Sequence, residues 1–210
     1  SRREAPGRRG TALSATRFAL ADIAPTPWKN GGGATREIAC WPAGTGLDSF
    51  DWRISVATIA ADGAFSVFAG IDRSITLLSG DGVLLHGEHG THRLDQPLVP
   101  FAFDGETPIR ATLLGGASED FNVMTRRGRC RADVKVWRYA VDWPSTPPHA
   151  ALLLAVQGDW RCAVAGDAPT LLTPGSGLWW SPAAARPAIS VQPQPRADDP
   201  ALLAVMIEHE

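Results

Sequence analysis

The 210-residue sequence predicts an all-β protein with very little helix. Short runs rich in β-branched residues recur along the chain, and turn-forming residues separate them at near-regular intervals. The chain also contains 21 glycines and 17 prolines, and both residue types weaken helix interiors. Residues 182–187, with proline at both ends, allow at most one helical turn. Such a pattern is typical of a β-sandwich or β-barrel, with strands expected at 53–59, 74–78, 82–86, 109–114, 121–125, 133–140, 151–156, 160–164 and 202–207.

A proline-rich segment at 141–149 divides the chain into two unequal parts. We interpret it as a stiff connection, because consecutive prolines hold a linker extended. Residues 18–130 then form a first unit and residues 131–210 a second, smaller one. Residues 1–17 carry few large apolar side chains near their start and are expected to form a mobile tail. The second unit is small for an independent barrel, so strands borrowed from the N-terminal region are one way to complete it.

Composition and charge argue against several classes of protein. The formal net charge is -2, which disfavours a general nucleic-acid or membrane-surface binder. No run of 18 apolar residues occurs, so no transmembrane helix is expected, and the basic N-terminus lacks the apolar stretch of a secretory signal. The three cysteines lie far apart without a CxxC pair, so we expect free thiols in a cytoplasmic protein.

The most distinctive motif is the segment Trp28–Gly33, which ends in three successive glycines. Such a run can present several backbone N–H groups to an anion. Lys29 adds a positive charge, and Asn30 adds an amide that both donates and accepts hydrogen bonds. The segment therefore predicts a ligand-facing loop, with a flexible β-turn and an exposed lysine as the alternative.

Two expected strands carry further polar candidates. Alternation places Arg53 and Ser55 on one face, where they would clamp a carboxylate if that face lines a barrel; on an outer face Arg53 is simply solvated. Asn122 and Met124 also share a face, so Asn122 would hydrogen-bond a ligand while Met124 packs against its carbon atoms. A structural cross-strand hydrogen bond is the alternative role of Asn122.

Other charged and aromatic groups have structural explanations that compete with functional ones. Arg73 and Glu37 form a buried ion pair or contact a ligand. The basic run Arg126–Arg131 has no interleaved aromatic residues, so local salt bridges or a solvated loop are favoured over nucleic-acid binding. The adjacent Trp179 and Trp180 pack in a core or in a subunit contact, which leaves a homodimer open.

Five segments together resemble the HutD/Ves family in their order and spacing, over about residues 18–130. One departure is Ala64, where the family commonly has proline, and it affects only a turn. The matching segments are Trp28–Gly33 with Thr35–Ile38, Phe50–Ala57, Asp62–Ser66 with Gly70–Arg73, Phe101–Gly105, and Asp120–Met124 with Arg126–Gly128.

The resemblance implies a bicupin, with two RmlC-like jelly-roll barrel units in one chain. It also implies a role in histidine utilisation, in which the protein binds a small anionic metabolite such as N-formylglutamate or urocanate and moderates the pathway without enzyme activity. We expect no cofactor, no nucleic-acid or membrane partner, and no catalytic residue. The ligand-binding residues expected in the first unit are Trp28, Lys29, Asn30, Gly31, Gly32, Arg53, Ser55, Arg73, Asn122 and Met124.

Two other classes of function stay open. The first is a cupin-type enzyme acting on a small acid or sugar derivative, either metal-free and epimerase-like or metal-dependent. Its weak metal-ligand candidates are His86, Glu88, His89 and His92. They do not form the HxH…E pattern that cupin enzymes often use, and a hairpin tip in solvent explains them more simply. The second is an interaction module that binds protein or nucleic acid.

Overall fold

The computed structural model describes residues 15–143, 148–182, 188–195 and 197–210. Within these ranges the regular secondary structure is almost entirely β-strand, with a single three-residue 3-10 helix, η1 (Leu20–Asp22), and no helix that is long and apolar enough to cross a membrane. Most of the expected tail, the centre of the proline-rich connection and most of 182–187 fall outside the described residues. Thr16 and Arg17, which we placed in the tail, belong instead to strand β1.

The strands form four antiparallel sheets. Sheet I contains β5 (Gly63–Ala64), β10 (Arg110–Leu113), β7 (Val83–Gly87) and β8 (Gly90–Leu94). Sheet II contains β2 (Thr26–Pro27), β3 (Gly33–Trp41), β4 (Trp52–Ile59), β11 (Ser118–Arg126), β6 (Ile71–Ser79) and β9 (Phe101–Asp104). Sheet III contains β1 (Thr16–Ala19), β17 (Ser176–Trp180), β14 (Ala150–Gln157), β19 (Ala201–His209) and β12 (Cys130–Trp137). Sheet IV contains β13 (Val141–Trp143), β18 (Ile189–Pro193), β15 (Trp160–Val164) and β16 (Thr170–Leu172).

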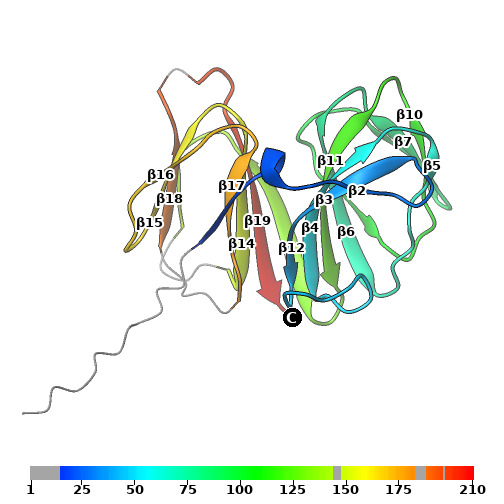
Figure 1. Ribbon diagram of the computed structural model, residues 1–210, viewed down its shortest axis with the longest axis horizontal. Coiled ribbons are helices and arrows are strands. Elements are labelled where there is room, and N and C mark those ends of the chain that lie inside the picture. The colour runs from blue at the N-terminus through cyan, green and yellow to red at the C-terminus, as the bar shows by residue number, and fades with distance from the viewer. Residues whose placement is uncertain (1–14, 144–147, 183–187, 196) are drawn as a thin grey trace, which may run out of the picture.

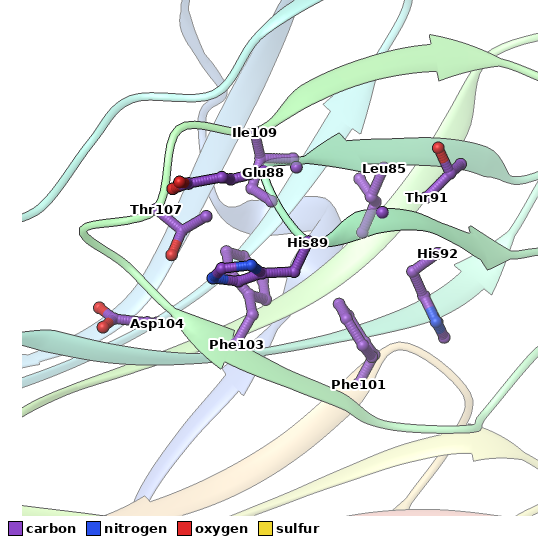
Figure 2. Close-up of a pocket in the computed structure, with 12 residues that line it drawn as sticks. Leu85, Glu88, His89, Thr91, His92, Phe101, Phe103, Asp104, Thr107 and Ile109 are labelled. Carbon is purple, nitrogen blue, oxygen red and sulfur yellow. The ribbon is translucent and has the colours of Figure 1, made fainter.

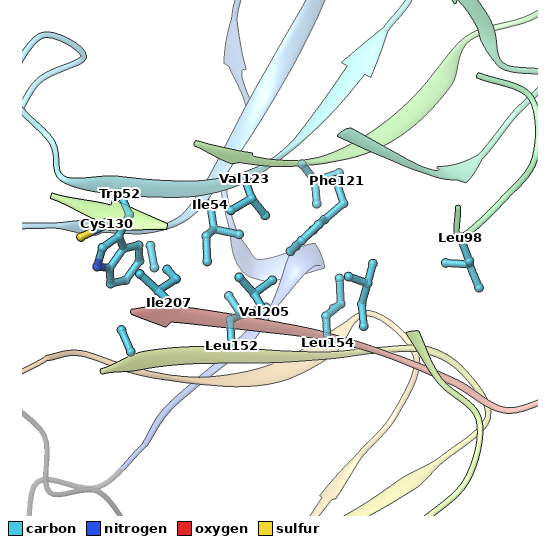
Figure 3. Close-up of a cluster of buried hydrophobic side chains, with 14 of the residues drawn as sticks. Trp52, Ile54, Leu98, Phe121, Val123, Cys130, Leu152, Leu154, Val205 and Ile207 are labelled. Carbon is cyan, nitrogen blue, oxygen red and sulfur yellow. The ribbon is translucent and has the colours of Figure 1, made fainter. Parts of the chain in front are cut away.

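The four sheets stack in the order I, II, III and IV (Figure 1). Sheets I and II make up the first unit, and sheets III and IV make up the second. Sheets II and III pack face to face through a large apolar cluster (Figure 3), in which Trp52 and Phe121 of sheet II meet Leu152 and Val205 of sheet III. Sheet III is therefore buried on both faces, which explains why β14 and β19 read as nearly continuous apolar runs.

The second unit has an apolar interior built around indole rings. Trp160 is fully buried, and Trp137 and Trp180 lie in the same cluster. The neighbouring Trp179 points the other way and packs against the cluster between the units, where it meets Trp52 edge to face at 6.0 Å. Strand β1, at the start of the described chain, pairs with β17 and so extends sheet III.

Each strand expected from the sequence overlaps a strand of the structure. The longest strand that the sequence pattern did not reveal is β3 (Gly33–Trp41). Its pairing with β4 shifts register between Glu37 and Ala39, and a β-bulge of this kind breaks the alternation that marks a strand. Most of the other missed strands, such as β2 and β5, are very short.

Candidate functional site

The inner face of sheet II, which is turned toward sheet I, carries a concentration of polar side chains. Strand pairing arranges them in adjacent rows, because residues opposite each other on neighbouring strands project on the same side. The outer face of the same strands carries Ile54, Val56 and Val123 in the apolar cluster shared with sheet III, together with the buried Thr76 and Thr125. The three inner rows are Arg53, Met124 and Arg73; Ser55, Asn122 and Ile75; and Ala57, Asp120 and Leu77.

Arg73 is a buried cation without an acidic partner among the described residues. Its side chain is enclosed by three aromatic rings, and its guanidinium carbon lies 5.0 Å from the ring centre of Phe103, 5.5 Å from that of Phe65 and 5.6 Å from that of Phe68. We call these three rings the aromatic cage. One long hydrogen bond, from Nη1 to the Ser66 carbonyl at 3.4 Å, joins Arg73 to the backbone, while Nε has no partner in the described chain.

The protonation of Arg73 reflects this environment. The pKa of Arg73 is lowered to about 10, mainly by burial and to a smaller extent by the nearby positive charge of Arg53. Charged groups buried without a counter-ion are unfavourable. An anion placed beside the guanidinium would offset both effects.

Arg53 has a carboxylate partner already. Its Nε lies 2.6 Å from Oε1 of Glu37, so the ion pair that we considered for Glu37 forms with Arg53 and not with Arg73. The register explains this choice, because Glu37 lies opposite Ser55, two residues from Arg53 on β4. The Glu37 side chain is 49% exposed whereas that of Arg53 is 14% exposed, so this side of the inner face opens toward solvent.

Ser55, Asn122 and Met124 are all buried on the inner face, and Asn122 and Met124 share that face as the alternation predicted. Asn122 lies directly opposite Ser55, and its Oδ1 atom has no hydrogen-bond partner in the described chain. Met124 lies between Arg53 and Arg73 in its row and contributes apolar surface. Three neighbouring strands therefore bring together five of the predicted site residues: Arg53, Ser55, Arg73, Asn122 and Met124.

Asp120 is the inner-face residue that the sequence did not single out. It is fully buried, and both of its carboxylate oxygens lack a hydrogen-bond partner among the described residues. Its row neighbours Ala57 and Leu77 are apolar. Burial raises the pKa of Asp120 to about 7, with a smaller contribution from the negative charge of Glu119. The available signal was alternation, since Asp120 precedes Asn122 by two residues and shares its face.

The Trp28–Gly33 segment forms a tight turn at the end of sheet II. Trp28 packs against the apolar core of the first unit, and its Nε1 donates a hydrogen bond to Oγ1 of Thr35 at 2.8 Å. Gly33 is needed for this packing, because a Cβ atom there would lie 2.2 Å from the carbonyl oxygen of Thr58 and 3.0 Å from the Trp28 ring.

The backbone N–H groups of the turn donate hydrogen bonds within the turn itself. Gly31 donates its N–H to the Trp28 carbonyl at 3.0 Å, and Gly32 donates to Oδ1 of Asn30 at 2.9 Å. These two N–H groups are thus engaged within the turn and are not directed at an anion, contrary to the nest that the glycine run suggested. The side chains of Lys29 and Asn30 are exposed, so the structure separates them from the buried polar residues of the inner face.

A pocket of about 360 Å³ lies between the β7–β8 hairpin and strand β9 (Figure 2). Phe101 and Phe103 form one wall, and Glu88 and His89 lie at the hairpin tip. His92 stacks on Phe101, with ring centres 3.6 Å apart and planes inclined by 6°. Because Phe103 also belongs to the aromatic cage, this pocket adjoins the surroundings of Arg73.

The residues present do not fit a metal centre. Both ring nitrogens of His86 are engaged by hydroxyl groups, Nδ1 with Thr91 at 3.0 Å and Nε2 with Thr112 at 3.1 Å. His92 is stacked on an aromatic ring. In the part of the chain that the structure describes, no group of three or more His, Cys, Asp or Glu side chains is arranged to hold a metal ion.

The basic run at 126–131 forms local salt bridges, as its sequence context favoured. Arg127 lies 2.7 Å from Asp72 and 3.2 Å from Asp104. Arg129 pairs with Asp51, Arg131 pairs with Glu208, and Arg126 donates to the backbone carbonyls of Asp48 and Phe50. Arg126, Arg127 and Arg129 thus fasten loops and strand ends of the first unit, whereas Arg131 pairs across β12 and β19 of sheet III.

Comparison with known sequences gives consistent matches. The model of the HutD family matches residues 20–197. Protein Ves of Cronobacter sakazakii is 41% identical over 156 residues, which cover 73% of this chain and 80% of that protein. An uncharacterised 21.2 kDa protein in the hutC 3′ region of Pseudomonas putida is 41% identical over 145 residues, which cover 69% of this chain and 75% of that protein.

Solved structures show the same fold. A conserved protein of unknown function from Pseudomonas aeruginosa PAO1 superposes with a TM-score of 0.82 at 30% identity, covering 93% of this chain and 99% of that one. HutD from Pseudomonas fluorescens SBW25, described as a formate condition, has a TM-score of 0.77 at 30% identity, with coverages of 94% and 100%. A cupin 2 conserved barrel domain protein from Leptotrichia buccalis has a TM-score of 0.60 at 10% identity, with coverages of 92% and 96%, and shows the cupin-like fold alone.

Proposed function

Because the chain belongs to the HutD family, which is linked to the histidine-utilisation locus, we propose that it is a non-enzymatic regulatory protein that binds a small anionic metabolite of that pathway. The binding site is the inner face of sheet II in the first unit. N-formylglutamate and urocanate are the ligands that we favour, since both are small acids of histidine breakdown. Occupancy of the site would report the concentration of the metabolite and so moderate the pathway.

The observation that carries this proposal is the buried Arg73 without an acidic partner in the described chain. A guanidinium forms two parallel hydrogen bonds with a carboxylate, and these charge-assisted bonds are among the strongest in proteins. The aromatic cage holds the side chain by cation–π contacts. Arg73 is thus fixed in place while Nε stays free for an anion. The formate condition named for the Pseudomonas fluorescens HutD structure involves the smallest carboxylate.

The chemistry of the inner rows supports the non-enzymatic part of the proposal. Among the described residues the rows hold guanidinium, amide, hydroxyl and thioether groups beside one buried carboxyl group. Asp120 has apolar row neighbours and no hydrogen-bond partner among the described residues. It is therefore not placed to activate a side-chain nucleophile of the protein. This arrangement suits the recognition of a small acid better than its conversion.

Isothermal titration calorimetry of the purified chain with N-formylglutamate and urocanate tests the proposal. We expect binding of at least one of these acids and no binding of its uncharged amide derivative. Arg73→Gln should weaken that binding by about 10- to 100-fold, which is the usual effect of losing a hydrogen bond to a charged group. Arg110→Gln, which removes an exposed charge on β10, is the matched control and should bind normally.

Two results would contradict the proposal. A correctly folded chain that binds neither acid would exclude these ligands, and an Arg73→Gln variant with unchanged affinity would remove the inner face as the site. Proton NMR of the bound acid over several hours checks the non-enzymatic part, because conversion of either metabolite would show directly in the spectrum.

A further inference from the structure

We propose that Asp120 accepts a hydrogen bond from the bound metabolite, so that the first unit selects acids that also carry an N–H or O–H donor. This inference rests on the proposed function, since it adds a specificity-determining residue to the same site. It assigns to the site two chemically different ends, one that holds an anion and one that holds a donor.

The first argument is that the hydrogen-bonding capacity of Asp120 is unused. The residue is fully buried, and neither carboxylate oxygen has a partner in the described chain. Buried polar groups in native proteins nearly always have partners, and exceptions point to a functional role. Oδ1 of Asn122, the next inner position along β11, is also an unused acceptor. The buried side-chain atoms of these two residues that lack a partner in the described chain are therefore all oxygen acceptors.

The second argument is that, among the described residues of sheets I and II, no cation pairs with Asp120. Its row neighbours are Ala57 on β4 and Leu77 on β6. The strands of sheet I that pack over this part of the sheet contribute Val83, Leu85 and Ala111 to the apolar core. Asp120 thus has no counter-ion from sheets I and II within the described residues, and a donor from a ligand is the complement that the site lacks.

The third argument is the separation of charge along the inner face. Arg53 and Arg73 flank Met124, which lies four residues beyond Asp120 on β11. At a rise of about 3.4 Å per residue, roughly 13 Å of strand separates the two levels. An acid whose carboxylate turns toward the arginines would place its other end toward Asp120. An amide or imidazole N–H at that end would find an acceptor.

Matched pairs of acids test this preference. Urocanate is compared by calorimetry with furylacrylate, in which a furan ring replaces the imidazole and removes the N–H. N-formylglutamate is compared with glutarate, which lacks the formamide. The acid with a donor should bind about 10- to 100-fold more tightly than its donor-free partner, as expected for a hydrogen bond to a charged acceptor.

Substitution of the acceptor identifies the residue responsible. Asp120→Asn keeps the shape of the side chain and should reduce the preference to a few-fold, and Asp120→Ala should abolish it, while the affinity for the donor-free acid is retained. Glu119→Gln is the matched control, because it removes a carboxylate from the adjacent outward position and should keep the full preference.

Proton linkage gives an independent readout. An ionised carboxylate accepts a ligand N–H more strongly than a protonated carboxyl group does, so binding near neutral pH should release protons from the fraction of Asp120 that is protonated. The binding enthalpy should then differ between phosphate and Tris buffers for the wild-type chain and not for Asp120→Asn.

The possible failures are distinct. If the donor-free acids bind as tightly as their partners, or if Asp120→Asn weakens both members of a pair equally, the role of Asp120 is wrong while the anion site stands. If none of the four acids binds, the proposed function fails and this inference fails with it.

Discussion

The two units of the chain share an architecture and differ in what they enclose. In both, a larger sheet faces a four-stranded one across an interior. The interior of the second unit is filled by aliphatic side chains and indole rings, with Trp160 at its centre. The interior of the first unit is apolar on the side of sheet I, but the inner face of sheet II adds Arg73, Asp120 and Asn122, all buried.

This difference separates stability from function. Burying apolar surface is the main favourable term in folding, whereas a buried polar group without a partner is destabilising. The second unit has the composition of a structural core. The first unit retains a buried cation and a buried carboxyl group that do not neutralise each other, and it tolerates them because sheet II is supported on its outer face by the cluster shared with sheet III. Under the proposed function, these unfavourable groups mark the first unit as the one that binds the ligand.

Truncating the core of the second unit should have the largest effect. Trp160→Ala removes a fully buried ring, and changes of this kind reduce the free energy of unfolding by about 3–5 kcal/mol. Urea denaturation followed by circular dichroism measures the loss. Leu171→Ala, at a side chain that is 45% exposed on the neighbouring strand, should change stability by less than about 0.5 kcal/mol. A small effect of Trp160→Ala would mean that the second unit is not the structural core.

Removing the charge of Asp120 should increase the free energy of unfolding, the opposite of the effect expected for Trp160→Ala. Its pKa is raised from 3.8 to about 7, and each unit corresponds to about 1.4 kcal/mol. Asp120→Asn should therefore stabilise the ligand-free chain, by up to about 4 kcal/mol at a pH above 7. Thermal and urea unfolding of both variants measure the difference. Destabilisation at this pH would show that the carboxylate has a protein partner after all.

The stability difference between Asp120→Asn and the wild type should depend on pH in a defined direction. A carboxyl group whose pKa is raised in the folded state favours folding below its unfolded pKa, and that contribution is lost as the pH rises through the folded pKa. For Asp120 the window runs from 3.8 to about 7. The stability advantage of Asp120→Asn over the wild type should thus be small near pH 4 and grow toward pH 8. Taking the difference between the two chains removes the contribution of the other carboxylates.

The sequence was sufficient for the fold class and for two local pairings of side chains. Alternation placed Arg53 with Ser55 and Asn122 with Met124, and the structure has both pairs on the same face of sheet II. Which face of the sheet they occupy could not be told from the sequence, because it depends on how sheet I packs over sheet II. The family resemblance and the all-β, cupin-like fold are confirmed by the comparisons. Strand β3 escaped detection because its bulge interrupts the period on which such a prediction depends.

The remaining features of the site depend on contacts between distant segments. The aromatic cage combines rings from the loop after β5 and from β9 around a residue of β6, and no local pattern reveals that meeting. The choice of Arg53 as the partner of Glu37 follows from the register of two strands. Asp120 was overlooked because a carboxylate in a strand is usually exposed, and only its burial distinguishes it.

Removing Glu37 should have the smallest effect on stability. It also tests the difference between the two arginines of the inner face, since Arg53 has an acidic partner and Arg73 has none among the described residues. In its ion pair with Arg53, the Glu37 side chain is 49% exposed. Pairs of this kind contribute less than about 1 kcal/mol to stability. Glu37→Gln should therefore leave the unfolding transition almost unchanged. It should nevertheless strengthen the binding of a carboxylate ligand by a few-fold, because Arg53 loses its competing partner and the positive potential around Arg73 increases. Calorimetry at low and high salt measures this gain, which screening should reduce. Weaker binding to Glu37→Gln would show that the carboxylate positions Arg53 for the ligand instead of competing with it.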